Sequence, residues 1–141
     1  MGAVNYGSSD YISIGLNVSR DFEEWEIEEI ENDIETLLNE YNFYYFHVVI
    51  KPGYYEGFYI DIENNFPVAF DWYEEKQDAQ KEITQIKRFL LGCVSLGLVQ
   101  YFPGWCTGYS TETETKAAIN TAIKAMRQDV KTTPTWKQYT A

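Results

Sequence analysis

The spacing of apolar residues alternates along the chain between steps of two and steps of three or four. Between Tyr11 and Val18 every second residue is Ile, Leu or Val, which predicts a half-buried strand. Segments 43–51, 57–63 and 98–102 are rich in β-branched and aromatic residues and also predict strands. The turn formers Pro52, Gly53 and Gly57 lie between the first two of these, so we expect segments 43–51 and 57–63 to pair as a hairpin.

Three other segments carry apolar residues at steps of three and four, the pattern of an amphipathic helix. The first stripe runs over residues 27–41, and Ser19 or Asp21 is its expected N-cap. The second begins at Asp78 and ends at residue 97. The third opens on a capping box of Thr111 and Glu114 and continues to residue 130.

This order of elements predicts an α+β fold. Strand, helix, strand, strand, helix and strand form a ferredoxin-like βαββαβ unit, with one added C-terminal helix. We expect an antiparallel sheet with helices packed on one face, in a single domain over residues 1–141. Residues 132–141 are expected to be an extended tail, and residues 68–73 are a candidate for a further short strand.

Charge is concentrated in one segment of the chain. The formal net charge is -11, and residues 21–41 contain ten acidic residues and no basic one. The remaining charges nearly cancel. A field of this sign disfavours direct contact with nucleic acid or anionic lipid and favours a basic protein partner. No stretch approaches the ~20 apolar residues that span a bilayer, so we expect a cytoplasmic protein without membrane contact.

Residues that commonly serve catalysis or metal binding are scarce. His47 is the one histidine, and the cysteines are Cys93 in the second helical segment and Cys106 in a glycine-rich loop. This is too few ligands for a zinc site, and the sequence has no glycine-rich phosphate loop or nucleophile motif. We therefore expect no enzyme, no cofactor and no metal. A thiol enzyme that uses Cys106 with His47 as its base is a weaker alternative.

The acidic residues of the first helix fall into two rows. At 100° per residue, one row contains Glu24, Glu28, Glu31 and Glu35, the other contains Glu29, Asp33 and Glu40, and Trp25 lies between them. Residues 24–35 carry roughly one charge per 2.4 Å of helix rise, between the ~1.7 Å of duplex DNA and the ~3.4 Å of one strand. Like charges four residues apart destabilise a helix by about 0.2–0.5 kcal/mol per pair, and no basic residue relieves them.

This charge layout resembles that of acidic DNA-mimic inhibitors of restriction or CRISPR nucleases. The resemblance implies a non-enzymatic inhibitor whose carboxylates stand in for phosphates in the basic groove of a nuclease or another nucleic-acid-binding protein, with Trp25 as an apolar anchor.

The alternative is a binding or assembly module, which includes a homo-oligomer, with the acidic helix as a solvated face. Its contacts would be the aromatic residues of two glycine-containing loops, Tyr54, Tyr55, Trp105 and Tyr109, together with the C-terminal aromatic residues Trp136 and Tyr139.

Overall fold

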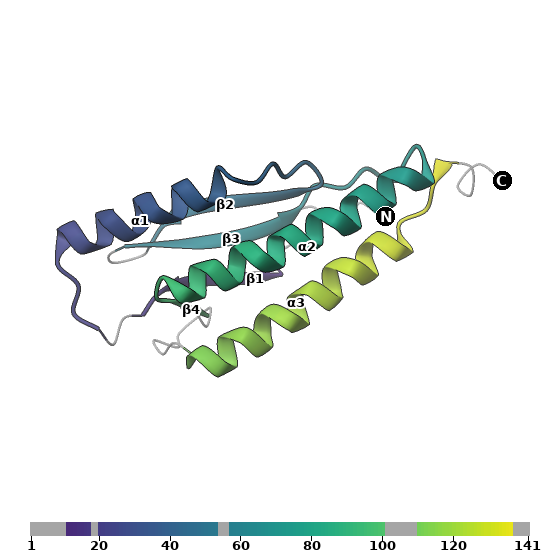
Figure 1. Cartoon of the computed structure of the whole chain (residues 1–141). Helices are drawn as coiled ribbons and strands as arrows, with labels where there is room; N and C mark the ends of the chain where they lie inside the picture. The colour runs from purple at the N-terminus through teal and green to yellow at the C-terminus, as the bar shows by residue number, and fades with distance from the viewer. Residues whose placement is uncertain (1–10, 18–19, 54–56, 101–109, 137–141) are drawn as a thin grey trace.

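The part of the chain that the structure describes folds into a four-stranded antiparallel sheet and three helices, which confirms the predicted α+β class. The computed structural model describes residues 11–17, 20–53, 57–100 and 110–136. The elements in chain order (Figure 1) are β1 (Ile12–Leu16), α1 (Glu24–Leu38), β2 (Phe46–Pro52), β3 (Phe58–Asn64), α2 (Tyr73–Ser95), β4 (Leu98–Gln100) and α3 (Glu112–Thr132). The strands lie side by side in the order β2-β3-β1-β4.

The strand register brings the apolar residues of neighbouring strands together. Strands β2 and β3 form the expected hairpin, in which Ile50 lies opposite Ile60. Ile60 in turn lies opposite Ile14 of β1, and Leu16 lies opposite Leu98 of β4. Because side chains of a strand alternate between faces, this register gives the sheet one continuous apolar face.

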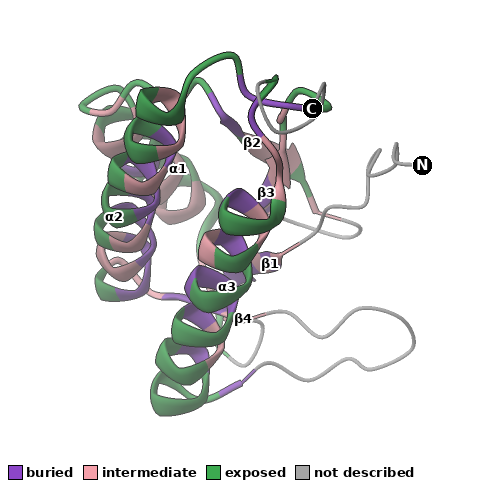
Figure 2. Ribbon diagram, turned by 90° about the vertical axis from the view of Figure 1, so that its right-hand side faces the viewer, coloured by how far each residue is buried: buried purple, intermediate pink, exposed green. Residues whose placement is uncertain are grey.

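That apolar face and all three helices share one hydrophobic core. Ile14, Ile60 and Ile62 of the sheet are fully buried, as are Ile34 of α1 and Met126 of α3. In Figure 2 the helices lie to one side of the strands, with buried positions on their inner surfaces. Most of the sheet's other face carries polar and half-buried positions.

Helix α1 is shorter than the sequence predicts at both ends. Its N-cap is Glu23, so the prediction of Asp21 is wrong, and Ser19 lies outside the described residues. The Glu23 backbone N–H donates to Glu26 Oε1 at 3.2 Å, and the Glu26 N–H donates back to the Glu23 carbonyl at 3.0 Å. At the other end, Tyr41 has left the helix and its ring stacks on Phe43, with centroids 5.6 Å apart.

Residues 68–73 do not form a strand. Helix α2 already begins at Tyr73, five residues before the expected start. The one bridge in this segment is parallel and joins Phe70 to Thr135, beyond the end of α3. Gly97, expected in the helical stripe, follows the end of α2 with φ 105°, a conformation that glycine adopts without strain as the chain turns into β4.

A buried carboxylate joins α2 to the first residues of β2. Glu82 is 6% exposed, and its Oε1 accepts hydrogen bonds from the backbone N–H groups of Tyr45 and Phe46, each at 2.9 Å. These bonds satisfy two donors at the start of the strand. Phe46 is therefore the first residue of β2, three residues later than the sequence predicts.

Candidate functional site: the acidic face of helix α1

Helix α1 is fixed to the molecule by its apolar stripe. Ile34 has no exposed surface, and Ile27, Ile30 and Leu37 pack partly buried against the core. Leu37 also approaches α2 closely, because a Cβ placed on Gly92 would lie 2.7 Å from Leu37 Cδ2. The absence of a side chain at Gly92 therefore lets α1 settle onto α2, which holds the opposite, charged face of α1 outward.

The predicted carboxylate rows lie on this outward face. Glu24, Glu28 and Glu35 are exposed and Glu31 is half-buried. In the second row Glu29 and Asp33 are exposed. None of these six forms an ion pair with another residue among those the structure describes. The helix thus presents a field of one sign that its own neighbours leave uncompensated.

Two further predicted residues of this site differ in their placement. Glu40 is exposed but follows the end of α1, so it lies in the turn and does not extend the second row as a helical position. The turn forms because the N–H groups of Glu40 and Tyr41 donate to the carbonyls three residues back, at 3.2 and 3.0 Å. Trp25 is 63% exposed at the N-terminal end of the helix, where an apolar contact is accessible to a partner.

The residues of the alternative hypotheses are only partly described. Tyr54, Tyr55, Trp105, Tyr109, Tyr139 and Cys106 lie outside the described residues. His47 is exposed on β2, with Nδ1 3.9 Å from Glu63 Oε2. Cys93 is buried in α2, and its burial raises the pKa of the thiol far above the usual range, so this sulfur is held as the unreactive thiol.

Charged residues also gather on the sheet face opposite the helices, which the sequence analysis did not identify. Lys51 Nζ lies 3.0 Å from Asp61 Oδ2 and 3.6 Å from Glu63 Oε1. Asp61 is 5% exposed, and Ser13 Oγ donates to its other oxygen at 3.4 Å. The hydrogen bond to Asp61 raises the pKa of Lys51, so the ammonium group of Lys51 is charged at neutral pH. The cross-strand pairing of Lys51, Asp61 and Glu63 is a structural role for this cluster.

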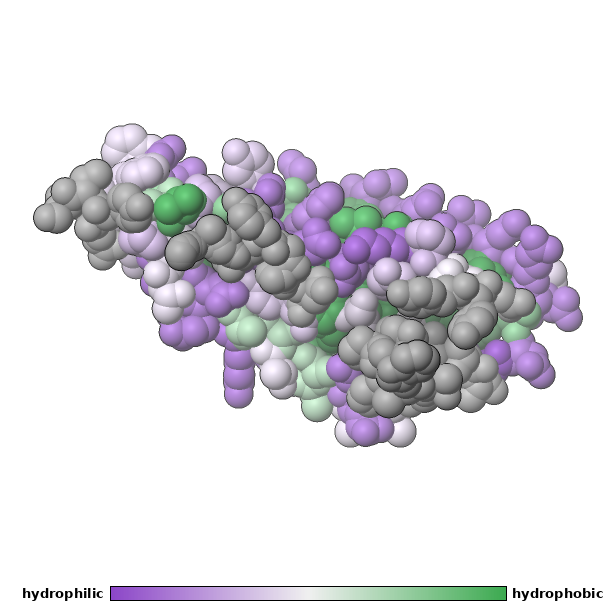
Figure 3. All heavy atoms as spheres, turned by 180° about the vertical axis from the view of Figure 1, so that it is seen from behind, coloured by the Kyte–Doolittle hydropathy of each residue, from purple (hydrophilic) through white to green (hydrophobic). Residues whose placement is uncertain are grey.

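A second group is a set of exposed large apolar side chains at the end of the molecule where α2 begins, of which the sequence analysis identified Trp136 alone. We call it the end patch; its members are Tyr44, Val68, Trp72, Tyr73 and Trp136. In the view from behind (Figure 3), this end, on the left, shows pale and green side chains, whereas the upper right edge, where α1 lies, is mostly hydrophilic.

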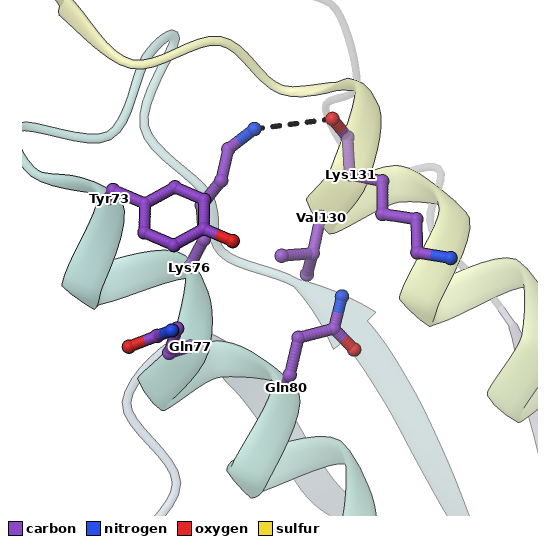
Figure 4. A pocket seen from close by; sticks show the side chains of 6 residues that line it. All are labelled: Tyr73, Lys76, Gln77, Gln80, Val130 and Lys131. Atoms are coloured by element: carbon purple, nitrogen blue, oxygen red, sulfur yellow. Dashed lines mark hydrogen bonds between the residues drawn. The ribbon is translucent and has the colours of Figure 1, made fainter.

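An open cavity of about 300 Å³ adjoins the end patch between α2 and α3. Figure 4 shows its lining, in which Lys76 Nζ donates to the backbone carbonyl of Lys131 at 3.2 Å; the other lining residues are Tyr73, Gln77, Gln80 and Val130. None of its lining residues belongs to α1, so the cavity lies outside the acidic face.

Among the described residues no helix has the length and apolar character needed to cross a membrane.

Comparisons of the chain with protein-family models, with curated proteins and with solved structures gave no match.

Proposed function

We propose that this protein is a non-enzymatic inhibitor of the anti-restriction or anti-CRISPR type, which places the acidic face of α1 in the basic nucleic-acid-binding groove of another protein. Glu24, Glu28, Glu31 and Glu35 substitute for phosphates along one strand, and Glu29 and Asp33 supply a shorter second row. Trp25 is an apolar anchor at the end of the helix.

The observation that carries the proposal is the uncompensated charge on α1. Surfaces of ordinary helices mix the two signs, and pairs of opposite charge three or four residues apart stabilise them. Here, like charges lie at those spacings, and no described basic residue pairs with the six helical carboxylates. Because repulsion between these carboxylates destabilises the helix, the arrangement favours a role in binding another molecule. A groove lined by Arg and Lys would offset that repulsion.

The helix is also suited to this role by its attachment. A partner that binds nucleic acid recognises charges at a fixed spacing, so a mimic gains affinity when its charges are held before binding. Burial of Ile34 and the close contact of Leu37 with Gly92 provide that rigidity. We also infer a ferredoxin-like scaffold, supported by the strand order β2-β3-β1-β4, and a cytoplasmic location, where nucleases of this kind act.

The experiment is capture of binding proteins from a lysate of the source cells on the immobilised full chain, at low and at high salt. We expect a basic nucleic-acid-binding protein to be retained at low salt, released at high salt and displaced by added DNA or RNA. The variant E24Q/E28Q/E31Q/E35Q should lose it. A control, E112Q/E114Q, removes two exposed negative charges that lie away from both α1 and the end patch and should retain it.

Retention of every partner by the α1 variant would exclude the phosphate-mimic function. If the captured protein also resisted displacement by nucleic acid, its groove would not be the site of contact.

A further inference from the structure

The end patch exposes four aromatic rings at one end of the molecule. Tyr44 is 74%, Trp72 69%, Tyr73 64% and Trp136 41% exposed. With roughly 150–250 Å² for each aromatic side chain, this is on the order of 500 Å² of exposed ring surface. Val68 adds to it with 63% exposure. Patches of this size on monomeric proteins are often functional.

Backbone hydrogen bonds and ring contacts join the segments that carry the patch. The Phe70 N–H donates to the carbonyl of Pro134 and the Trp136 N–H donates to the carbonyl of Phe70, both at 2.8 Å. Phe70 is fully buried and its ring lies 5.5 Å from that of Tyr45, which lies 5.0 Å from that of Tyr44. Figure 1 shows the corresponding segments, the turn before α2 and the chain after α3, at the end of the molecule opposite the N-terminus of α1. The segments that carry Tyr44 and Trp136 are therefore joined to the buried Phe70 without a partner.

The rim beside Trp72 is acidic. Asp71, Glu74 and Asp78 are exposed around the start of α2. Glu75 lies beside the rings. One carboxylate oxygen accepts a hydrogen bond from the Tyr45 hydroxyl at 3.3 Å, and the other accepts one from the backbone N–H of Trp72 at 3.3 Å. Among the described residues, Lys76 and Lys131 line the cavity beside Tyr73. Aromatic faces and carboxylates thus meet on one side of the patch.

Aromatic faces beside carboxylates are the surroundings that a guanidinium group prefers. A guanidinium group stacks on aromatic faces and pairs with carboxylates at the same time. A second copy of this chain would instead bring the same carboxylates face to face across a two-fold interface, which is repulsive.

We propose that the end patch is a docking site for an arginine-rich segment of a protein partner. The proposal rests on the proposed function for the class of partner, because the same basic protein would meet α1 with its groove and the end patch with a flanking segment. Two contacts on one partner raise the affinity through effective concentration without either being strong alone. The patch would then distinguish the true target from other proteins with a basic groove.

The test uses the ¹⁵N-labelled full chain and, as probe, a synthetic ten-residue peptide of alternating arginine and glycine. The readout is the indole N–H resonances, since Trp72 and Trp136 report on the end patch and Trp25 on α1; Trp→Phe variants assign them. We expect saturable shifts of Trp72 and Trp136, in the wild type and in E24Q/E28Q/E31Q/E35Q. The variant Y44A/W72A should weaken this binding about fivefold or more, whereas W25A, which removes an equally exposed ring elsewhere, should leave it unchanged.

The dispersion of the backbone amide resonances shows that each variant is folded. Absence of shifts at Trp72 and Trp136, or equal shifts with a matched peptide of glutamate and glycine, would overturn the docking site. A shift of Trp25 alone, lost in E24Q/E28Q/E31Q/E35Q, would also overturn it and leave the role of α1 standing. Failure of the phosphate-mimic function is seen separately, as capture of the partner by that same α1 variant.

Discussion

Replacement of Glu24, Glu28, Glu31 and Glu35 by glutamine is expected to stabilise the fold while it removes the proposed binding row. The change eliminates three like-charge pairs on α1, namely 24 with 28, 28 with 31 and 31 with 35. At about 0.2–0.5 kcal/mol each, their loss raises the free energy of unfolding by about 1 kcal/mol. Loss of the favourable helix-dipole interaction of Glu24 in the first turn is offset by loss of the unfavourable one of Glu35 in the last.

The assay is urea and thermal unfolding at low salt. The expected gain corresponds to a rise in Tm of about 3 °C for a domain of this size. In 0.5 M salt, where charges are screened beyond about 4 Å, most of the gain should disappear. None of the four side chains accepts a hydrogen bond from a described residue, so no compensating loss is expected.

For stability alone the control is D71N/E74Q/D78N/E112Q, which changes the net charge as much as the α1 variant does but should not stabilise the fold. Asp71, Glu74 and Glu112 lie at or just before helix N-termini, where a negative charge is favourable, and Glu112 pairs with Lys116 at 3.1 Å. A general effect of net charge would stabilise both variants alike. The account of α1 is refuted if its variant is no more stable than the wild type at low salt, or if the gain persists in high salt.

Three further predictions concern the scaffold. Glu82→Ala leaves the N–H groups of Tyr45 and Phe46 buried without their acceptor and should lower the free energy of unfolding by about 2–5 kcal/mol in urea titrations; an unchanged midpoint would contradict the role assigned to Glu82. Gly92→Ala alone should leave the free energy of unfolding nearly unchanged, because the gain in helix stability is offset by the movement that Leu37 must make. In a Leu37→Ala background the same change should raise the free energy of unfolding by about 1 kcal/mol. Equal effects in both backgrounds would show that the two residues are not coupled. Burial, and after it the charge of Glu75, raise the pKa of Tyr45 to about 12 from its ordinary 10.0. The tyrosine therefore deprotonates first in the unfolded chain, and the free energy of unfolding falls as the pH rises above 10. Tyr45→Phe should reduce this loss of stability at alkaline pH, and an equal loss in both proteins would contradict the prediction.

Local periodicity predicted the elements of this fold well because burial on one face is written into neighbouring residues. The alternation of Ile12, Ile14 and Leu16 predicted β1, and the capping box of Thr111 and Glu114 predicted the start of α3. The ends of strands and helices were harder to predict from the sequence, because they depend on groups far away in the chain. The start of β2 is set by Glu82, more than 35 residues further along the chain.

The candidate site was predictable to a similar extent. The outward position of Glu24, Glu28 and Glu35 follows from the helical repeat alone. Trp136 of the end patch was identified as a docking point from the sequence, but its other members were not predictable, since large rings are usually buried and nothing local to Tyr44 or Trp72 indicates otherwise. The bridge between Phe70 and Thr135, which joins segments 65 residues apart, brings Trp136 to the end of the molecule where Trp72 lies.

The central claim, that α1 stands in for a phosphate backbone, is tested most directly by the salt dependence of its complex with the captured partner. If the four replaced carboxylates occupy phosphate positions, the slope of log Kd against log salt should be smaller in E24Q/E28Q/E31Q/E35Q than in the wild type, by up to about 3. The control E112Q/E114Q, away from both α1 and the end patch, should keep the wild-type slope. Equal slopes for the wild type and the α1 variant would contradict the claim, because the partner would then bind a different surface of the protein.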